Sequence, residues 1–382
     1  MLKDPSIPFF SGAVGLHEAR EGLAARVRRI AESGRFVDGP AVAELEQAVS
    51  AYTEARYAVA CNNASDALIL MMKAAGIGAG DEVIVPAYTF LATASCVVHA
   101  GAEPVFADVL PDSYALDPDS VRAAIGPNTK AIMAVHLFHQ AADLHTLREI
   151  AYEYGLDFFE DSAEAIGMRV GDTHAGLWGR AGVLSFFPTK TLGALGDAGM
   201  LITDDEQLAQ RATHLRRPGS AGRGDGHTLT GMDSRCDELQ AAVLLTRLRS
   251  LDADISRRAE LSERYTARLA PLAPVVTTPA RADAREPSNL VWYVYLIETE
   301  RRDELVGFLQ ENGVGTETYY PRPLTAQPCF QGRPGTRVPV PVPVAEAAAE
   351  RALALPLYPD LTEAQVDRVC DLVHEFHRGT RR

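Results

Sequence analysis

The sequence predicts an α/β protein in which a mostly parallel sheet of seven strands lies between helices, followed by a smaller α+β domain. Between residues 57 and 203, short runs rich in β-branched and aromatic residues alternate with longer amphipathic stretches. Strand and helix in alternation produce a parallel sheet covered on both faces. After residue 271 the composition changes and a new strand and helix pattern begins. We therefore expect a large domain over residues 1–250, its N-terminal helical segment included, and a small C-terminal domain over residues 251–382.

The elements of the large domain follow from their periodicity. Residues 16–50 have helical spacing, interrupted at residues 33–40, and Pro40 suits the first turn of the second helix. The runs that predict strands are short and bounded by turn residues. They are residues 57–61, 82–86, 104–108, 131–136, 157–160, 183–187 and 200–203.

The second half of the chain begins with a long helical pattern that continues, with breaks, from residue 235 to about 270. Residues 271–287, rich in Pro, Ala and Arg, predict a connecting loop. The small domain should then contain a strand over residues 289–298, a helix over 303–312, a Pro/Val segment over 338–344 and a C-terminal helix from about residue 363.

Composition narrows the range of functions. The 382 residues carry 37 basic and 51 acidic side chains, a net charge of −14, and 47% are hydrophobic. Such a chain can bury a sizeable core but is a poor candidate for binding nucleic acid or an anionic membrane. No apolar run approaches the ~20 residues that cross a bilayer, and no signal core follows Met1, so we expect a cytoplasmic protein. The five dispersed cysteines and the histidines show no metal-ligand spacing, so we expect no metal.

Glycine-rich segments do not indicate a nucleotide cofactor. Residues 76–80 lie between a predicted helix and a strand, with no helix after them, which predicts a helix stop and turn. Residues 193–199 lack the Gly-x-Gly start of a dinucleotide fingerprint, and neither segment ends in Gly-Lys-Ser/Thr.

Lysine is scarce: only Lys3, Lys73, Lys130 and Lys190 occur, against 33 arginines. Lys190 follows the apolar run 183–187 by one short turn. An amine at the end of a buried strand loses solvation, which favours its neutral, nucleophilic form. For an isolated lysine, the alternative is a strand-end side chain that reaches solvent.

A carboxylate is predicted at the end of a neighbouring strand, and together with Lys190 it indicates a particular kind of site. Asp161 follows the strand run 157–160, and ligands bind beyond the carboxyl ends of strands in α/β sheets. Pyridoxal 5'-phosphate needs a lysine for its Schiff base and a carboxylate to keep its ring nitrogen protonated. Taken alone, Asp161 could equally be a helix N-cap.

A phosphate site is expected after the first strand. Asn63 is a good N-cap, Ala64 and Ser65 are small, and the helix that they open favours an anion at its N-terminus. Capping alone would also explain Asn63.

These segments, in this order, resemble the DegT/DnrJ/EryC1/StrS family of sugar aminotransferases, whose members depend on pyridoxal phosphate and have the aspartate aminotransferase fold (fold type I). The resemblance covers nearly the whole chain. Its strongest matches are residues 80–90 (GDEVIVPAYTF), 160–164 (EDSAE), 185–190 (SFFPTK) and 234–242 (SRCDELQAA).

The resemblance implies roles for individual residues. Lys190 would hold the cofactor and move protons, and Asp161 would pair with its ring nitrogen. Phe90 would stack on the ring, with Tyr88 as a possible substitute. The remaining cofactor contacts implied are Ala64, Ser65, Ser185 and Glu164, and the substrate contacts implied are Tyr319, Tyr320 and Arg235. Family active sites lie at a homodimer interface, with the segment around residues 233–235 reaching into the partner's site.

Four positions depart from the family pattern. The family usually has Gln or His at Glu164, Tyr at Met232, Asn at Asp233, and often His at Tyr319. A carboxylate beside a phosphate is repelled, so we expect Asp233 to turn away from the cofactor, toward Arg235 or substrate.

The function implied is transfer of an amino group from an amino acid, L-glutamate by expectation, to a keto sugar. A nucleotide-linked 3- or 4-keto-6-deoxysugar in amino-sugar or antibiotic biosynthesis is the expected acceptor, and a keto-cyclitol of the scyllo-inosose type is the nearest alternative. A sugar dehydratase of the same fold is disfavoured, because those relatives replace the lysine with His. The intact pair of Lys190 and Asp161 disfavours a non-catalytic regulatory protein.

Overall fold

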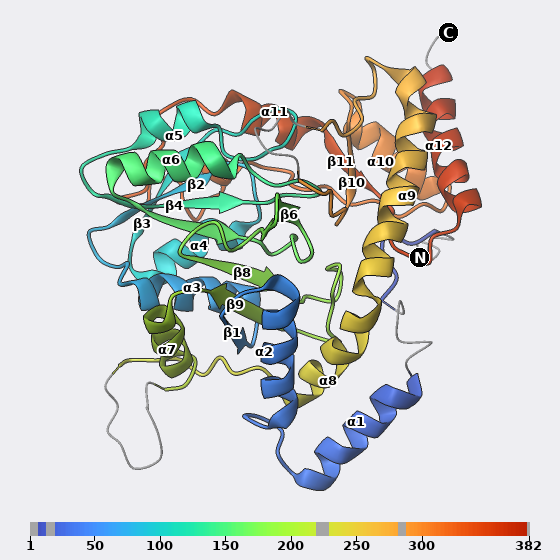
Figure 1. Cartoon of the computed structure of the whole chain (residues 1–382). Coiled ribbons are helices and arrows are strands. Elements are labelled where there is room, and N and C mark those ends of the chain that lie inside the picture. The colour runs from blue at the N-terminus through green and yellow to red at the C-terminus, as the bar shows by residue number, and fades with distance from the viewer. Residues whose placement is uncertain (1–6, 13–19, 219–228, 282–287, 380–382) are drawn as a thin grey trace.

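A computed structural model describes residues 7–12, 20–218, 229–281 and 288–379, and contains a seven-stranded sheet in the order β1-β9-β8-β5-β4-β2-β3 (Figure 1). Strand β9 runs antiparallel to both of its neighbours, β1 and β8, and all other pairs are parallel, so the predicted mostly parallel sheet is confirmed. Each of the seven strands predicted for the large domain lies within two residues of its observed bounds. The strands are β1 (Tyr57–Cys61), β2 (Glu82–Pro86), β3 (Glu103–Ala107), β4 (Thr129–Val135), β5 (Asp157–Asp161), β8 (Ala181–Ser185) and β9 (Gly199–Thr203).

Helices cover both faces of this sheet (Figure 1). Side chains alternate between the faces along each strand: in β9, Leu201 packs with one helical layer, whereas Met200 and Ile202 pack with the other. The first layer contains α3 (Ala64–Ala75), α4 (Leu91–Ala100) and α7 (Glu206–Leu215). The second contains α2 (Pro40–Thr53), α5 (Pro118–Ala124), α6 (Leu144–Tyr154) and α8 (Glu238–Arg247).

The helix ends match the local signals in the sequence. Pro40 occupies the first turn of α2, and the Asn63 side chain caps α3 by accepting the Asp66 amide at 2.8 Å. Gly76 ends α3 in the left-handed conformation (φ 86°), so the helix-stop interpretation of residues 76–80 is confirmed. No side chain of the N-cap residue caps α2. The buried Glu238 carboxylate, distant in the sequence, caps this helix instead by accepting the amides of Ala41 and Val42, both at 2.9 Å.

A second hydrophobic core lies beside the sheet (Figure 1). Its helices are α9 (Leu251–Leu269), α10 (Arg302–Glu311) and α12 (Glu363–Arg378), and its strands β10 (Tyr295–Glu298) and β11 (Ala352–Leu355) pair antiparallel. α8 leads into α9 through a single 3₁₀ turn, Leu248–Ser250. A domain division at residue 250 would therefore cut a nearly continuous helical path, and it stays a prediction.

Three shorter elements complete the described chain. They are α1 (Arg20–Ser33), α11 (Pro343–Arg351) and the hairpin of β6 (Arg169–Val170) and β7 (Thr173–His174). Among the described residues, no helix combines the length and the apolar character needed to cross a membrane.

The sequence prediction was wrong over residues 289–298, where only the last four form a strand. The preceding residues bond instead to a loop beside the large sheet: the Val291 amide donates to the His139 carbonyl (3.1 Å) and the Tyr293 amide to the Phe138 carbonyl (2.8 Å). Alternating hydrophobicity reports burial and does not identify the bonding partner.

The other differences are smaller. The Pro/Val segment over 338–344 runs into α11, whose first residue is Pro343, and β11 was not predicted. Of the predicted loop over 271–287, residues 282–287 lie outside the described part of the chain, as does Lys3.

Candidate active site

A cavity of about 860 Å³ lies at the carboxyl ends of β4, β5 and β8. On one side its wall is the edge of the large sheet and the start of α3; on the other it is formed by Tyr293 and residues 317–320. The cavity brings together most of the predicted site. Its lining includes Lys190, Asp161, Glu164, Ala64, Ser65, Phe90, Ser185, Tyr319 and Tyr320.

Lys190 is held inside this cavity. The turn after β8 is closed by a hydrogen bond from the Lys190 amide to the Phe187 carbonyl (2.8 Å). The side chain is only 15% exposed, and its Nζ lies 2.8 Å from Oε1 of Glu164. The alternative of a strand-end lysine reaching solvent is therefore wrong.

Asp161 is the last residue of β5 and is 5% exposed. Its Oδ2 accepts the Thr93 hydroxyl at 2.7 Å, and its Oδ1 accepts the Ala163 amide at 3.3 Å. Burial raises the pKa of Asp161, while these two donors and the charge of Lys190 act in the opposite direction. The next element along the chain is the strand β6, so the helix-cap interpretation is wrong. A cationic partner in the cavity would stabilise the charged form of this buried carboxylate.

The N-terminus of α3 forms the floor of the same cavity. Ala64 and Ser65 are its first residues, and Ser185 at the end of β8 faces them across the lining. β9 passes close to this helix start: a Cβ on Gly199 would lie 2.4 Å from the Ala64 nitrogen, so only glycine fits. A helix N-terminus with two hydroxyls is a suitable donor set for a phosphate group. Together with Lys190 and Asp161, these groups fit pyridoxal phosphate.

Aromatic rings form the opposite wall. Tyr319 stacks on Phe138 with ring centroids 6.5 Å apart, and the Phe90 ring lies 6.2 Å from that of Tyr320. Phe90 is 58% exposed. Tyr88 is buried behind the wall, where its hydroxyl accepts the Tyr320 amide at 2.8 Å. This geometry favours Phe90 over Tyr88 as the ring that meets a ligand.

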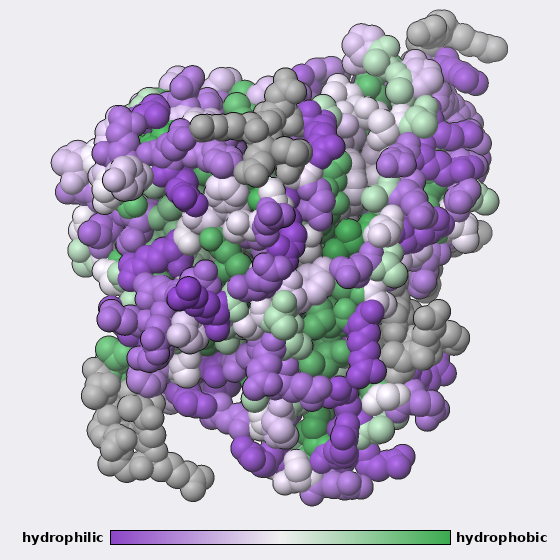
Figure 2. Space-filling view, viewed as in Figure 1, coloured by the Kyte–Doolittle hydropathy of each residue, from purple (hydrophilic) through white to green (hydrophobic). Residues whose placement is uncertain are grey.

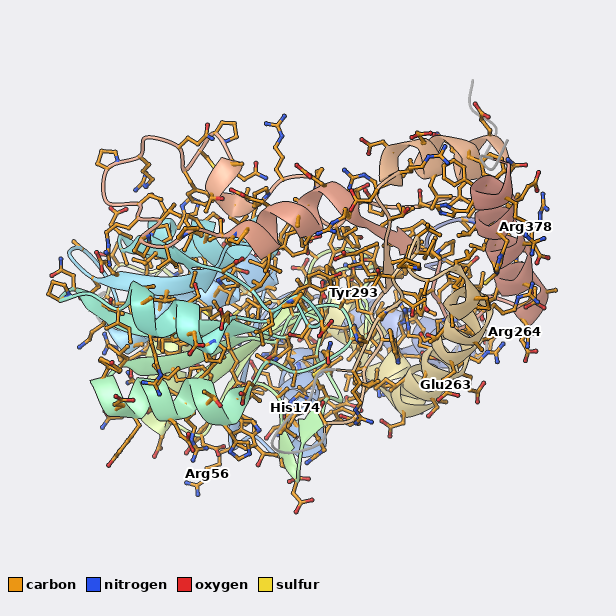
Figure 3. The ribbon with its side chains drawn as sticks, turned by 90° about the horizontal axis from the view of Figure 1, so that it is seen from above. Arg56, His174, Glu263, Arg264, Tyr293 and Arg378 are labelled. Carbon is orange, nitrogen blue, oxygen red and sulfur yellow. The ribbon has the colours of Figure 1, made fainter. Side chains whose placement is uncertain are left out.

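Tyr293 is a site residue that the sequence analysis missed. Lys190 Nζ lies 4.0 Å from the centre of its ring, and its hydroxyl lies 2.9 Å from the Thr189 hydroxyl. Burial raises the pKa of Tyr293 to about 12, and the charge of Glu164 adds to the effect, so the phenol stays neutral. Figure 3 shows Tyr293 where the sheet-bearing part of the molecule meets the part formed by α9 and α12. Nothing in its local pattern distinguished it from a strand residue. Thr93, which donates to Asp161, was missed because nothing in the local pattern distinguishes it from another buried residue of α4.

Arg235 is placed differently from the other predicted residues. Its guanidinium pairs with the Asp233 carboxylate through contacts of 2.9 and 3.1 Å, and reaches Asp38 at 3.5 Å. The expected turn of Asp233 toward Arg235 is therefore confirmed. Among the described residues, Arg235 is not part of the lining of its own chain's cavity.

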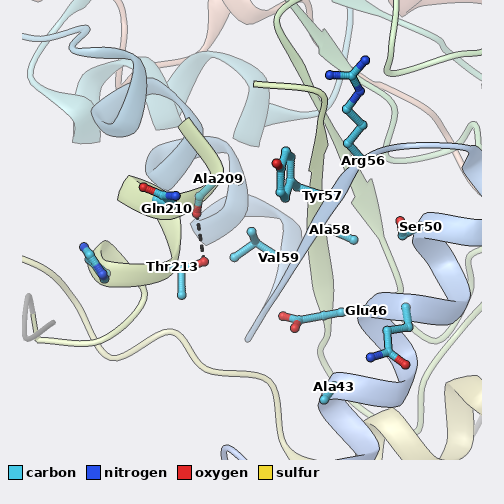
Figure 4. A pocket seen from close by; sticks show the side chains of 12 residues that line it. Ala43, Glu46, Ser50, Arg56, Tyr57, Ala58, Val59, Ala209, Gln210 and Thr213 are labelled. Carbon is cyan, nitrogen blue, oxygen red and sulfur yellow. Dashed lines mark hydrogen bonds between the residues drawn. The ribbon is translucent and has the colours of Figure 1, made fainter. Parts of the chain in front are cut away.

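A smaller hollow of about 370 Å³ lies between α2, β1 and α7 (Figure 4). Two of its polar side chains have partners within the protein: Glu46 accepts the Ala60 amide at 2.9 Å, and the Thr213 hydroxyl donates to the Ala209 carbonyl at 2.8 Å. It contains no lysine and lies at the edge strand β1, away from the carboxyl ends of β5 and β8. We therefore place the active site in the larger cavity.

Residues 17–374 match the model of the DegT/DnrJ/EryC1/StrS aminotransferase family. The chain belongs to this family. The resemblance inferred from the motifs is thus confirmed, and so are the expected fold and the aminotransferase class.

Similar proteins have differing names. A "Pleiotropic regulatory protein" of Geobacillus stearothermophilus is 41% identical, with 95% of this chain and 97% of the relative covered. A "dTDP-3-amino-3,4,6-trideoxy-alpha-D-glucose transaminase" of Streptomyces venezuelae is 39% identical, with 97% and 96% covered. Among solved structures, ntda of Bacillus subtilis with bound cofactor PMP superposes with a TM-score of 0.89 at 30% identity, with 98% and 86% covered. The cofactor of that structure agrees with the donor set of this cavity.

Proposed function

We propose that this protein is a pyridoxal phosphate-dependent aminotransferase that moves an amino group from an amino acid, L-glutamate, to a nucleotide-linked 3- or 4-keto-6-deoxysugar in the cytoplasm. The observation that carries the proposal is the meeting of Lys190 and Asp161 in one cavity, at the carboxyl ends of the neighbouring strands β8 and β5. The name of the transaminase from Streptomyces venezuelae supports the choice of acceptor. Amino-sugar biosynthesis is the corresponding pathway class.

The cofactor would supply a carbonyl carbon and a ring that accepts electrons. Lys190 provides the amine that binds that carbon and, once free, the base that moves a proton in the transfer. Asp161, buried and bonded to Thr93, provides the negative charge that keeps a ring nitrogen protonated. Ala64, Ser65 and Ser185 would donate to the phosphate.

The aromatic wall would bind the acceptor. A sugar presents C–H faces and hydroxyl edges, and tyrosines offer a ring for the first and a hydroxyl for the second. Burial raises the pKa of Tyr320, and likewise that of Tyr319, so both phenols remain hydrogen-bond donors at neutral pH. Tyr319 and Tyr320 are therefore the proposed substrate contacts.

We propose a homodimer with shared active sites. Apolar side chains are exposed around the start of α8: Phe36 is 54% exposed and its carbonyl accepts the Glu238 amide, and the exposed Leu195 donates its amide to Gln240, two residues further along α8. Figure 2 shows hydrophobic side chains at the surface between the sheet-bearing part and the column of α8 and α9. Exposed apolar patches of this kind mark association surfaces. In the dimer, Arg235 would contact substrate in the partner's cavity.

Subunit mixing tests this arrangement. Lys190→Ala and Arg235→Ala proteins, each inactive or weakly active alone, should recover part of the activity when subunits exchange, because one site in a mixed dimer is intact. A fully active monomer in analytical ultracentrifugation would contradict the shared site.

The activity is tested by incubating the purified protein with pyridoxal phosphate, L-glutamate and a panel of acceptors, with products identified by mass. The panel contains 3-keto and 4-keto nucleotide deoxysugars and a keto-cyclitol of the scyllo-inosose type. Amination of a nucleotide sugar, absent with Lys190→Ala, is the expected result. Amination of the cyclitol alone would move the substrate class to the alternative.

One relative favours a second candidate function. The protein from Geobacillus stearothermophilus is named as a regulator, so a regulatory role must be tested alongside catalysis. A purified protein that takes up no cofactor by visible absorbance, and aminates nothing in the panel, would support that role over the enzyme.

A further inference from the structure

Residues 7–9 connect the second core with the active-site cavity. Ile7 is buried in the second core, where its amide donates to the Gly313 carbonyl at 3.0 Å and its carbonyl accepts the Gly315 amide at 2.9 Å. Two residues further on, the half-buried Phe9 lines the cavity. The backbone bonds of Ile7 therefore fix the place at which the Phe9 ring enters the site.

Glycine at position 315 allows the close approach of this segment. A Cβ on Gly315 would lie 2.7 Å from the backbone nitrogen of Phe9 and 3.4 Å from the Phe9 Cβ. Any larger residue would push the two backbones apart. The position of Phe9 is thus set by contacts with the second core, not by the sheet that carries Lys190 and Asp161.

Phe9 ends a row of rings that begins beside Lys190. The Tyr293 ring lies 4.0 Å from Nζ of the lysine, and Tyr319 stacks on Tyr293 with centroids 6.3 Å apart. Phe9 meets Tyr319 edge to face, with centroids 6.0 Å apart and an interplanar angle of 75°, an arrangement that aromatic pairs favour. Since Lys190 marks the carbon that receives the amine, Phe9 should meet a part of the acceptor away from that carbon.

Phe9 differs from the tyrosines of this wall because its side chain has no polar atom. A hydroxyl or carboxylate placed against its ring would lose water without gaining a hydrogen bond, whereas a methyl group would gain from burial. Glu317, exposed on the same wall two residues before Tyr319, disfavours a negatively charged diphosphate there. The part of a nucleotide-linked sugar that fits this place is therefore a ring substituent without oxygen.

We propose that Phe9 is a specificity-determining residue, which contacts the methyl group of a 6-deoxysugar acceptor and favours it over the same sugar with a hydroxymethyl group at C6. This role rests on the proposed function in taking a nucleotide-linked sugar as the ligand of the cavity. Phe9 thereby explains why the acceptor should be a 6-deoxysugar, whereas Lys190 and Asp161 act on any keto group.

Binding without turnover tests this role. The full-length protein, loaded with pyridoxal phosphate, is titrated by calorimetry with glucose and 6-deoxyglucose linked to dTDP or to UDP, which carry no keto group and cannot be aminated. The 6-deoxy form should bind about tenfold more tightly, within the ~10²-fold by which an apolar site rejects an added hydroxyl. In Phe9→Ala its affinity should fall about tenfold, while that of the glucose form should change less than about twofold.

Three further variants separate contact from structure. Phe9→Leu keeps an apolar side chain and should keep most of the preference. Gly315→Ala keeps the Phe9 ring but displaces its backbone, so it should reduce the preference as Phe9→Ala does. Phe10→Ala is the matched control, because within the described chain Phe10 does not line the cavity, and it should leave both affinities unchanged. Circular dichroism shows that each variant is folded.

Three results would overturn the role of Phe9. They are an equal loss of affinity for both sugars in Phe9→Ala, which would place the ring against a part that the two share, such as the base; a parent protein without a preference; and a parent protein that binds none of the four sugars. No amino group is transferred in this experiment. Its failure is therefore distinct from failure of the transamination assay, which tests the proposed function.

Discussion

The two walls of the cavity differ in chemistry and in origin. The sheet wall carries charge, and its groups stand at strand and helix ends: Asp161 closes β5, Lys190 follows β8, and Ser65 opens α3. The opposite wall carries neutral aromatic rings from Tyr293, Tyr319 and Tyr320, which belong to the segments entering and leaving the second core. This contrast fits separate functions for the two walls. Groups on rigid strand ends suit binding of a cofactor that is the same in every relative. Rings on a separate segment suit binding of a substrate that differs between relatives.

The first way to test this division is Lys190→Ala. If the sheet wall carries the chemistry, losing its amine should reduce turnover by at least about 10⁴-fold, the upper range for a group that moves a proton in the reaction. Turnover is measured with glutamate and the best acceptor in the panel, and the visible absorption of the bound cofactor should change as well. Normal turnover would remove the basis of the proposed function.

Asp161→Ala should have the next largest effect. Without the buried charge the cofactor ring accepts electrons less well, so kcat should fall on the order of 10²-fold, as for a lost electrostatic contact in a catalytic site. Thr93→Val is the matched control, because it removes the hydroxyl bonded to Asp161 and leaves the carboxylate. It should cost much less. Equal losses in the two variants would show that the carboxylate acts only through local structure.

The packing behind the aromatic wall should be sensitive to acid through His139, which follows Phe138 in the chain. His139 stacks on Trp292 with ring centroids 4.3 Å apart, and burial lowers its pKa to about 4. Because the folded-state pKa lies below the ordinary value of about 6.5, His139 is neutral in the folded protein. Its contribution to stability is present above that value and is lost as the pH falls toward 4.

Urea unfolding at pH 7 and pH 5 measures this loss, which should be about 2 kcal/mol for His139. His139→Gln should reduce the difference between the two pH values by that amount. Buried His174, whose pKa is lowered to about 3, would still contribute in the variant. An unchanged difference in His139→Gln would place the acid sensitivity elsewhere.

Tyr319→Leu should separate the walls kinetically. Loss of an aromatic contact to the sugar should raise KM for the acceptor about tenfold, with little change in cofactor affinity. Steady-state kinetics and a cofactor titration followed by absorbance give the two readouts. A large loss of cofactor affinity would show that Tyr319 also contributes to cofactor binding, contrary to separate functions of the two walls.

Asp233→Asn should have the smallest effect. Since Arg235 already holds the Asp233 carboxylate, removing the charge should leave the affinity for pyridoxal phosphate unchanged, or raise it by relieving repulsion. Titration of the cofactor-free protein measures it. A tenfold loss would show that the carboxylate has a positive role in holding the cofactor.

The sequence could predict what depends on local pattern. Strand bounds such as those of β1 and β2, the α3 cap at Asn63 and the stop at Gly76 follow from side-chain alternation and from backbone preferences that act within a few residues. Lys190 and Asp161 were found because strand ends of a parallel sheet meet at one edge, which is a consequence of topology alone.

What the sequence did not reveal depends on contacts between distant segments. The ring of Tyr293 lies beside Lys190, 103 positions earlier in the chain, only because its backbone bonds to Phe138 instead of extending β10. Glu164 was predicted as a cofactor contact through family resemblance, yet its contact with Lys190 is set by the Phe138 amide. The hydrophobic periodicity and the composition of the sequence indicate which residues are buried. The hydrogen bonds that choose their partners form only when the second core packs against the sheet, and tertiary structure alone decided them.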